Sequence, residues 1–339
     1  MMDNAVEIDP TIMGSVPRLY EKIFAVANDK AREQGRLKLA LFDWAVGVGR
    51  RVASTRERGQ SVDVLLAAQY SVAKRLVLNR IRGRFGQRLR FAISGGAPLA
   101  KELAEWFHGA GIHVLEAYGL TETTAGTNGN RPTHFRFGTV GPAFEGVEVK
   151  IAGDGEILLR GPNIMSGYWH KEAETREVID PDGWFHSGDI GAIDDEGFLR
   201  ITDRKKDIIV TAGGKNVAPQ NIESLLKQSP WISQAMVHGD KRPYLVALLT
   251  LNADAAGRFA HETGVASDLG TLATNPEVRA RVGREIDAAN ARLSPFETIK
   301  KFHILPVDFT IEGGELTPTL KVKRKVVTER HRALLDAMY

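Results

Sequence analysis

The chain has 339 residues, 43% of them hydrophobic and 26% charged, which is typical of globular proteins with two or three domains. Its 45 basic and 42 acidic side chains leave a net charge of +3, too small to indicate a nucleic acid as partner. The absence of cysteine excludes disulfides, thiolate metal sites and a cysteine nucleophile, and favours a cytoplasmic location. No apolar run approaches the roughly 18 to 20 residues that span a bilayer, so we expect any membrane contact to be peripheral.

The first ninety residues predict mostly helices. Leu19, Ile23 and Phe24 repeat at helical spacing after Pro17, a residue tolerated in the first turn of a helix. Residues 74–90 then hold a run of lysines and arginines with no acid among them. Such a run is usually a solvated helix face; the sharper hypothesis is a surface for anionic lipid or for ligand phosphates.

A strand–helix–strand pattern follows over residues 89–120. LRFAISGG predicts a strand that ends in glycines, PLAKELAEWFHGAG predicts a helix with one apolar face, and IHVLEAYGL predicts a second strand. Such a βαβ unit predicts a parallel sheet with ligands beyond the carboxyl ends of its strands. The short alternating runs of residues 137–202 predict a small antiparallel sheet or barrel.

A second unit is predicted to begin at Asp203. Residues 206–212, 235–240 and 244–251 favour strands, and residues 219–228 and 275–293 favour helices, a mixed α+β pattern. We therefore expect an α/β fold with a large domain over residues 1–202, made of a mostly helical part (1–90), a βαβ part (91–136) and a small β subdomain (137–202). A smaller α+β domain, residues 203–339, would follow a tight hinge near Asp203.

Three motifs suit a nucleotide. In SGGAP, the small residues Gly95, Gly96 and Ala97 would let the backbone approach a flat ligand closely, although an ordinary strand-to-helix turn explains them equally well. In YGLTET, the Tyr118 ring can stack on a purine, and a threonine and a carboxylate follow that can bind phosphate and Mg²⁺. A polar loop after a strand is the simpler alternative.

The third motif is residues 182–206, DGWFHSGDIGAIDDEGFLRITDRKK. Asp189 lies beside apolar residues, so its carboxylate needs hydrogen-bond donors, and ribose hydroxyls provide two. Taken singly, Asp189 reads as a turn residue and Arg204 as part of a surface ion pair. The Gly213–Gly214 pair that follows also suits an ordinary hairpin turn.

These motifs occur in the order SGGAP, YGLTE, GWFHSGD, DRKKD, GGK and TPTLK, and in that order they resemble the long-chain fatty acyl-CoA synthetases of the adenylate-forming, AMP-binding superfamily. SVPRLYEKI, residues 15–23, is similar to a segment of the long-chain branch. The resemblance implies an AMP-forming ligase that joins a fatty acid to ATP as acyl-AMP, with Mg²⁺, and passes the acyl group to coenzyme A.

The resemblance also implies roles for single residues. Thr121 would contact the α-phosphate, Glu122 would bind Mg²⁺, and Arg204 would contact the ribose and phosphate region. Rotation about Asp203 would bring Gly213 and Gly214 to the pantetheine channel. Residues that line the adenosine are implied as follows: Gly95, Gly96 and Ala97 in one wall, Tyr118 and Gly119 on the adenine, and Asp189 on the ribose hydroxyls.

LTPTLKVKRK, residues 316–325, resembles the segment with the adenylation lysine. A mobile ammonium there would stabilise negative charge on the phosphate as it reacts. The spacing selects Lys321, but many relatives have glycine at the position of Leu320, so Lys323 stays open as an alternative. A basic surface strand is the simpler interpretation.

The family's phosphate loop, which ends in Pro-Lys-Gly, is not found in the sequence; residues 123–132 imitate it in the wrong place. We therefore expect the chain to correspond to the C-terminal half to two-thirds of such an enzyme, with an uncovered sheet edge that pairs with an N-terminal half. An aryl-CoA ligase, a fatty acyl-AMP ligase that serves a carrier protein, and a non-catalytic fragment that binds a nucleotide or a partner remain alternatives.

Overall fold

The computed structural model describes residues 2–339 and divides into two compact units, Met1–Ile201 and Thr202–Tyr339. The sequence places this boundary between residues 202 and 203. Each unit has its own sheets and its own apolar core. Each is therefore described by itself.

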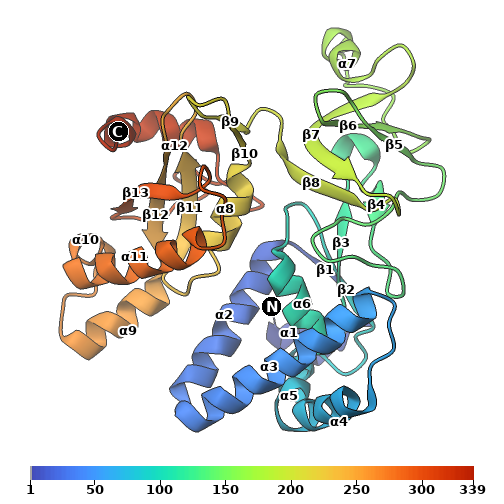
Figure 1. Cartoon of the computed structure of the whole chain (residues 1–339). Helices are drawn as coiled ribbons and strands as arrows, with labels where there is room; N and C mark the ends of the chain where they lie inside the picture. Colours follow the sequence, from blue (N-terminus) through green and yellow to red (C-terminus); the bar gives the residue numbers. More distant parts are fainter. Residues whose placement is uncertain (1) are drawn as a thin grey trace. The chain divides into compact units, whose positions relative to one another are not determined.

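The first unit contains a sheet whose strand order is β1-β2-β3-β4 (Figure 1). The strands β1 (Ile12–Ser15), β2 (Phe91–Ser94) and β3 (Val114–Tyr118) are parallel, and β4 (Asn128–Gly129) runs antiparallel to β3. The sequence did not predict β1, because its four residues show no clear alternation and their only partner strand lies far along the chain. β1 forms the edge of this sheet.

Helices cover this sheet. The chain forms α1 (Met2–Ile8), α2 (Pro17–Glu33), α3 (Arg36–Glu57) and α4 (Val64–Ala73), which continues through a π-helical turn (Lys74–Leu78) into α5 (Asn79–Arg82) and a 3₁₀ turn (Gly83–Phe85). α6 (Lys101–Gly109) connects β2 to β3. α3 and α6 cross closely because each has a glycine at the contact. A Cβ on Gly49 of α3 would lie 2.8 Å from the carbonyl oxygen of Gly109 of α6. The core here contains Tyr20, Trp106 and Phe107.

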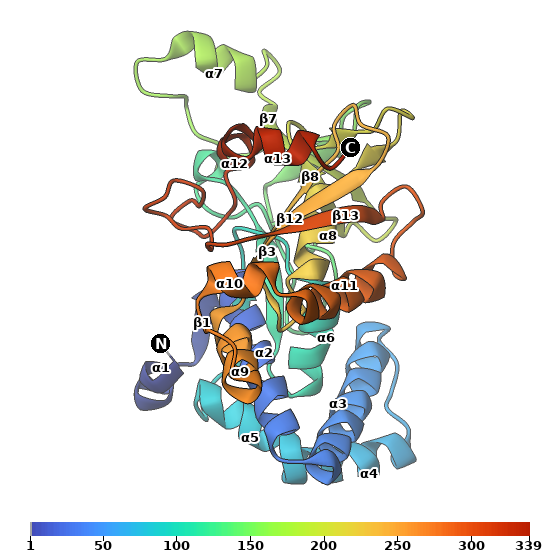
Figure 2. The ribbon, with the colours of Figure 1, turned by 90° about the vertical axis from the view of Figure 1, so that its left-hand side faces the viewer.

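A second sheet of the first unit has the order β5-β6-β7-β8. It consists of β5 (Glu148–Ile151), β6 (Glu156–Arg160), β7 (Phe185–Ile193) and the start of β8 (Leu199–Arg204), whose last three residues belong to the second unit; β6 is antiparallel to both β5 and β7. β7 lacks a clear apolar alternation in the sequence, because it contains small or polar residues such as Ser187 and Gly188. α7 (Glu172–Val178), between β6 and β7, stands apart from the sheet (Figure 2).

The second unit is built on β11 (Ile232–His238), β12 (Leu245–Leu251) and β13 (Ile299–Leu305), with β11 antiparallel and β13 parallel to β12. Alternate side chains of β12 enter two cores: Ala247 and Leu249 pack in one, Val246 and Leu248 in the other. The first core takes residues of α8 (Pro219–Leu226), α9 (Ala253–Thr263), α10 (Leu269–Thr274) and α11 (Pro276–Asn290). The second takes residues of α12 (Arg324–Arg330) and α13 (Arg332–Asp336).

A short hairpin, β9 (Ile209–Val210) with β10 (Asn216–Val217), precedes α8 in the second unit. Over residues 2–339, no helix combines the length and the apolar character needed to cross a membrane.

Candidate functional site

The three parallel strands of the first unit end at one edge of their sheet. Ser15 of β1 is in register with Ser94 of β2, which is in register with Glu116 of β3. The Gly95 N–H donates to the Ser15 carbonyl at 3.2 Å, and a Cβ on Gly95 would lie 3.5 Å from the Ala117 carbonyl oxygen. The SGGAP segment therefore begins beside the end of β3, where the YGLTET motif also begins.

A buried acid connects the segments that flank these two motifs. Glu116, 7% exposed, accepts a hydrogen bond from the Leu99 N–H at 3.3 Å through Oε2. Burial raises the pKa of the Glu116 carboxyl to about 8, so this group is largely neutral at pH 7. Sequence reasoning did not predict this contact, because an acid inside a predicted strand is ordinarily placed on the solvent side.

Tyr118 and Asp189 are in direct contact. The Tyr118 hydroxyl donates to Oδ2 of Asp189 at 2.6 Å, and the two residues are 8% and 5% exposed. Tyr118 packs in one apolar cluster with Phe185 of β7 and Leu199 of β8, and the Asp189 N–H donates to the Ser187 hydroxyl at 3.1 Å. The pair therefore connects the end of β3 to β7, so the two sheets of the first unit meet at residues taken from two different motifs.

The chain folds back on itself immediately after Tyr118. A Cβ on Gly119 would lie 1.5 Å from the Ala125 carbonyl oxygen, so only glycine fits there. Thr121 lies exposed in the short 3₁₀ turn (Thr121–Thr123). Thr124 and Ala125 follow with φ of 50° and 79°, in the left-handed region that glycine favours. Backbone packing thus explains Gly119, while the exposed Thr121 is open to a ligand.

Glu122 occupies the middle of this turn. Its Oε1 accepts a hydrogen bond from the Tyr168 hydroxyl at 2.9 Å, and its carbonyl accepts the Met165 N–H at 2.8 Å. Within residues 2–339, no three His, Cys, Asp or Glu side chains gather as a metal cluster. A single carboxylate nevertheless fits Mg²⁺, which proteins often bind through one or two carboxylates together with substrate phosphates.

In the second unit, Asp203 is anchored to the start of α8. Its carboxylate accepts the Arg204 N–H at 2.7 Å and the Gln220 N–H at 3.0 Å. Asp203 is 2% exposed, and burial raises its pKa to about 6. The candidate hinge residue is therefore held firmly within the second unit.

Gly213 and Gly214 form the turn between β9 and β10. The Gly214 N–H donates to the Thr211 carbonyl at 2.8 Å, and Gly214 has a φ of +72°. A Cβ on Gly213 would meet nothing closer than the Thr211 hydroxyl at 3.9 Å. The backbone of this turn therefore favours glycine at position 214, while position 213 faces open space.

Lys321 lies exposed on a tight turn. Its N–H donates to the Thr317 hydroxyl at 3.0 Å, and its carbonyl accepts the Thr317 N–H at 2.8 Å. Leu320 has a φ of +61°, a left-handed conformation. The position at which the sequence departs from the glycine of many relatives is thus one where the backbone favours glycine.

An ion pair between the buried Glu223 and the half-buried Arg324 anchors the segment that follows Lys321. The Arg324 guanidinium donates to both carboxylate oxygens of Glu223 in α8, at 2.8 and 3.0 Å, and to the Val237 carbonyl at 2.7 Å. The Val237 N–H in turn donates to Glu223 at 2.7 Å. The lysine turn is therefore tied to the same helix that Asp203 caps.

The structure brings together three of the predicted positions of the first unit: Gly95 just after β2, Tyr118 at the end of β3, and Asp189 in the middle of β7. The second unit holds the other predicted residues. They lie on three separate segments: Arg204, the Gly213–Gly214 turn and Lys321. Sequence reasoning missed Glu116, Asn163 and Tyr168. The last two lie about 40 residues beyond the turn that they contact, and only GPN, typical of a loop, marks their neighbourhood.

Comparison with known proteins agrees with these motifs. A family model described as AMP-binding enzyme matches residues 1–169, and one described as AMP-binding enzyme C-terminal domain matches residues 206–339. The long-chain-fatty-acid–CoA ligase FadD15 of Mycobacterium tuberculosis is 43% identical over 97% of this chain and 55% of its own length. The long-chain-fatty-acid–CoA ligase ACSBG2 of Mus musculus is 34% identical over 98% of this chain and 53% of its own.

A solved structure is similar in fold. The adenylation domain of a carboxylate reductase from Mycobacterium chelonae superimposes with a TM-score of 0.72 at 22% identity, over 100% of this chain and 48% of that one. The chain spans about half the length of the curated relatives that it matches. The chain belongs to the AMP-binding enzyme family.

Proposed function

We propose that this chain provides the AMP-binding and acyl-transfer part of a long-chain fatty acid–CoA ligase. The fatty acid carboxylate would displace pyrophosphate from ATP to give acyl-AMP, and the thiol of coenzyme A would then displace AMP to give acyl-CoA. The observation that carries the proposal is the hydrogen bond between Tyr118 and Asp189, which joins two motifs of the family at one place. The names of the relatives supply the fatty acid and coenzyme A.

In this proposal the first unit binds the adenosine. The Tyr118 ring would stack on the adenine, with its hydroxyl already fixed by Asp189, and residues 95–97 would form a wall of the same pocket. The Asp189 carboxylate would accept the ribose hydroxyls. Because the pair is set before the ligand arrives, little side-chain freedom is lost on binding.

The phosphates would lie at the turn after β3. The Thr121 hydroxyl would donate to the α-phosphate, and Glu122 would hold Mg²⁺, which when bound neutralises charge on the phosphate oxygens. The Lys321 ammonium would stabilise the additional negative charge of the reacting α-phosphate, and Arg204 would contact the ribose and phosphate region. Lys323, exposed two residues further on, is the alternative donor.

The second half-reaction would use the second unit in another orientation. Asp203 is the residue about which we propose that it turns, bringing the Gly213–Gly214 turn to the pantetheine arm of coenzyme A. The open space at Gly213 supports this role, because packing within the unit does not require glycine there. A side chain at this position would instead obstruct a narrow channel.

We propose that a further strand pairs with the free edge of β1. β1 has a partner only on its β2 side in the described sheet, and Ile12 is 49% exposed. An exposed strand edge is a template for pairing, and the N-terminal half of a related enzyme would supply the missing strand. A monodisperse, soluble monomer of residues 1–339 in a sizing experiment would contradict this pairing.

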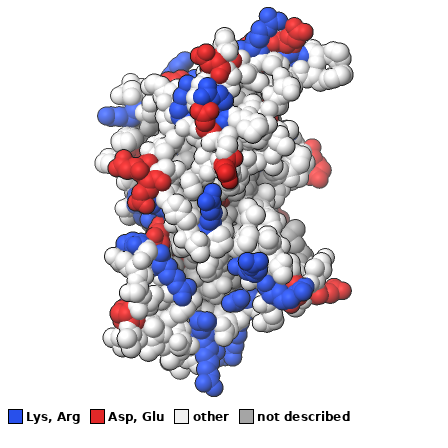
Figure 3. All heavy atoms as spheres, turned by 90° about the vertical axis from the view of Figure 1, so that its right-hand side faces the viewer, with Lys and Arg blue, Asp and Glu red and all other residues white. Residues whose placement is uncertain are grey.

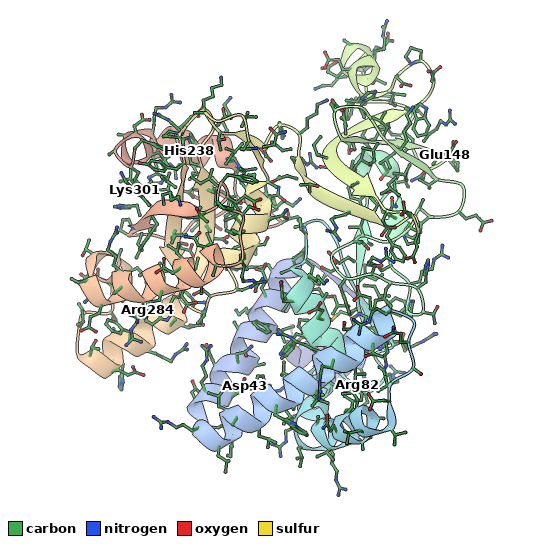
Figure 4. All side chains as sticks on the ribbon, in the orientation of Figure 1. Asp43, Arg82, Glu148, His238, Arg284 and Lys301 are labelled. Atoms are coloured by element: carbon green, nitrogen blue, oxygen red, sulfur yellow. The ribbon has the colours of Figure 1, made fainter. Side chains whose placement is uncertain are left out.

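We also propose a cytoplasmic protein that contacts the inner face of the membrane through the outer side of α4 and α5. This side exposes Val64, Leu65, Val72 and Leu76 at 87%, 69%, 50% and 44%, and residues 64–90 contain no acid. Lysine and arginine atoms gather in the lower part of Figure 3, and Figure 4 labels Arg82 in this region. Apolar and basic side chains on one face suit an anionic lipid surface.

Vesicle sedimentation tests the membrane contact. The chain should bind vesicles of phosphatidylglycerol more strongly than those of phosphatidylcholine, and Arg75→Glu with Arg80→Glu should abolish the difference. Equal binding by the variant and the wild type would contradict the proposal.

Calorimetry and isotope exchange test the ligase proposal itself. The chain should bind AMP, and a hexadecanoic acid should promote exchange of labelled pyrophosphate into ATP. Formation of the thioester with coenzyme A, but not of a product on a carrier protein, would establish the acceptor. Absence of AMP binding by folded wild-type chain would refute the proposal for this chain.

A further inference from the structure

The loop between β6 and α7 grips the turn that carries Glu122. The Asn163 side-chain amide donates to the carbonyls of Thr123 and Gly126, at 3.1 and 3.2 Å. The Thr124 hydroxyl donates back to the Asn163 carbonyl at 2.9 Å. One side chain therefore holds both ends of a four-residue stretch of backbone.

That stretch is strained. Thr124 and Ala125 have φ of 50° and 79°, in the left-handed region that is unfavourable for non-glycine residues. Such a conformation persists only where the surroundings impose it. The two bonds from Asn163 span the strained pair, so this side chain is one constraint on it from outside the motif.

The same loop fixes the Glu122 carboxylate. The Tyr168 hydroxyl donates to Oε1 at 2.9 Å, leaving Oε2 for a cation. The backbone of Tyr168 is anchored in turn, because its N–H donates to the Thr175 hydroxyl at 2.9 Å. The chain before it packs tightly: a Cβ on Gly167 would lie 2.8 Å from Thr175 Cγ2. The Tyr168 hydroxyl therefore approaches Glu122 from a rigid support.

We propose that Asn163 and Tyr168 are positioning residues for the phosphate and cation site. The inference rests on the proposed function, and deepens it with two residues outside the motifs. Asn163 keeps the turn after Tyr118 in its strained shape, and Tyr168 selects the orientation of the Glu122 carboxylate. Side chains that orient a metal ligand typically affect metal affinity by 10–100-fold when they are removed.

The first test compares binding of ATP with and without Mg²⁺ by calorimetry. Tyr168→Phe should reduce the gain in affinity given by Mg²⁺ about tenfold while leaving metal-free ATP binding unchanged, and a higher Mg²⁺ concentration should restore it. Tyr70→Phe, which removes a hydroxyl from a buried tyrosine of α4, is the matched control and should behave as wild type. An unchanged Mg²⁺ dependence in Tyr168→Phe would overturn its positioning role.

The second test needs no ligand. Deuterium exchange of the amides in residues 121–126 should be accelerated at least tenfold by Asn163→Asp, which removes both donors without changing the size of the side chain, and not by Tyr70→Phe. Unchanged exchange would overturn the role of Asn163. If wild-type chain binds no ATP, the proposed function fails, and exchange near Glu122 in Tyr168→Phe then decides the role of Tyr168: unchanged exchange rejects it and faster exchange supports it.

Discussion

The hydroxyl of Tyr118 donates to the carboxylate of Asp189 at 2.6 Å, across 71 residues of sequence. Both side chains are buried, so the bond connects the parallel sheet of the first unit to its antiparallel sheet. Each residue belongs to a motif that the sequence associates with adenosine. Their contact brings the two motifs together.

This bond predicts strong energetic coupling. Tyr118→Phe and Asp189→Asn should each lower the unfolding free energy of the first unit, and the double variant should lose less than the two losses combined. We expect a coupling of about 1.5–3 kcal/mol, as for hydrogen bonds to charged groups. Urea titration with pulsed deuterium exchange, read on peptides of residues 1–201, measures it. Additive losses would show that the bond is absent in solution.

The buried Glu116 predicts that the unfolding free energy of the first unit depends on pH. Because its folded pKa of about 8 lies above the ordinary value of 4.5, its favourable contribution is present below pH 4.5 and is lost as the pH rises to about 8. The loss is at most about 1.4 kcal/mol per pH unit. Glu116→Gln should match wild type at pH 5 and exceed it in unfolding free energy at pH 8.5. The same urea titration, with every pulse given at one common pH, checks this; a constant difference would refute it.

The Arg324–Glu223 ion pair predicts a large loss of stability in the second unit when the arginine is removed. Arg324→Met leaves the Glu223 carboxylate, 6% exposed, without its cation, which should lower the unfolding free energy of this unit by about 3–5 kcal/mol. Adding Glu223→Gln should recover part of this loss of stability, because the side chain at position 223 is then neutral. Exchange on peptides of residues 202–339 reports both. A loss below about 1 kcal/mol for Arg324→Met would show that the pair is exposed to solvent.

The left-handed backbone at Leu320 predicts that glycine can replace this leucine with little change in stability. Its left-handed backbone costs a leucine about 1–2 kcal/mol, which offsets the greater freedom of glycine in the unfolded chain. Leu320→Gly should therefore leave the unfolding free energy within about 1 kcal/mol of wild type, whereas Leu320→Val should lower it, because a β-branched residue fits this region worse. If Leu320→Val matches Leu320→Gly, the turn does not have this conformation.

The sequence predicted what depends on neighbouring residues. The Tyr118 motif, the Gly213–Gly214 turn and the strands β2, β3, β11 and β12 all have signals within ten residues. β1 was missed because its stability comes from pairing with β2, and β7 because Ser187 and Gly188 break its pattern. Tyr168 and Asn163 were missed because their partners are brought to them only by the folded loop. Hydrogen bonds between distant segments leave no periodic trace in a sequence.

The central claim is that the ends of β2 and β3 and the middle of β7 form one site for AMP, with Asp189 on the ribose. The most direct measurement compares the affinities for AMP and 2′,3′-dideoxy-AMP in wild-type chain and in Asp189→Ala. We predict that wild type prefers AMP by tenfold or more, as for hydrogen bonds to a charged group, and that the preference disappears in the variant. An equal preference in both proteins, or no preference in wild type, would contradict the account.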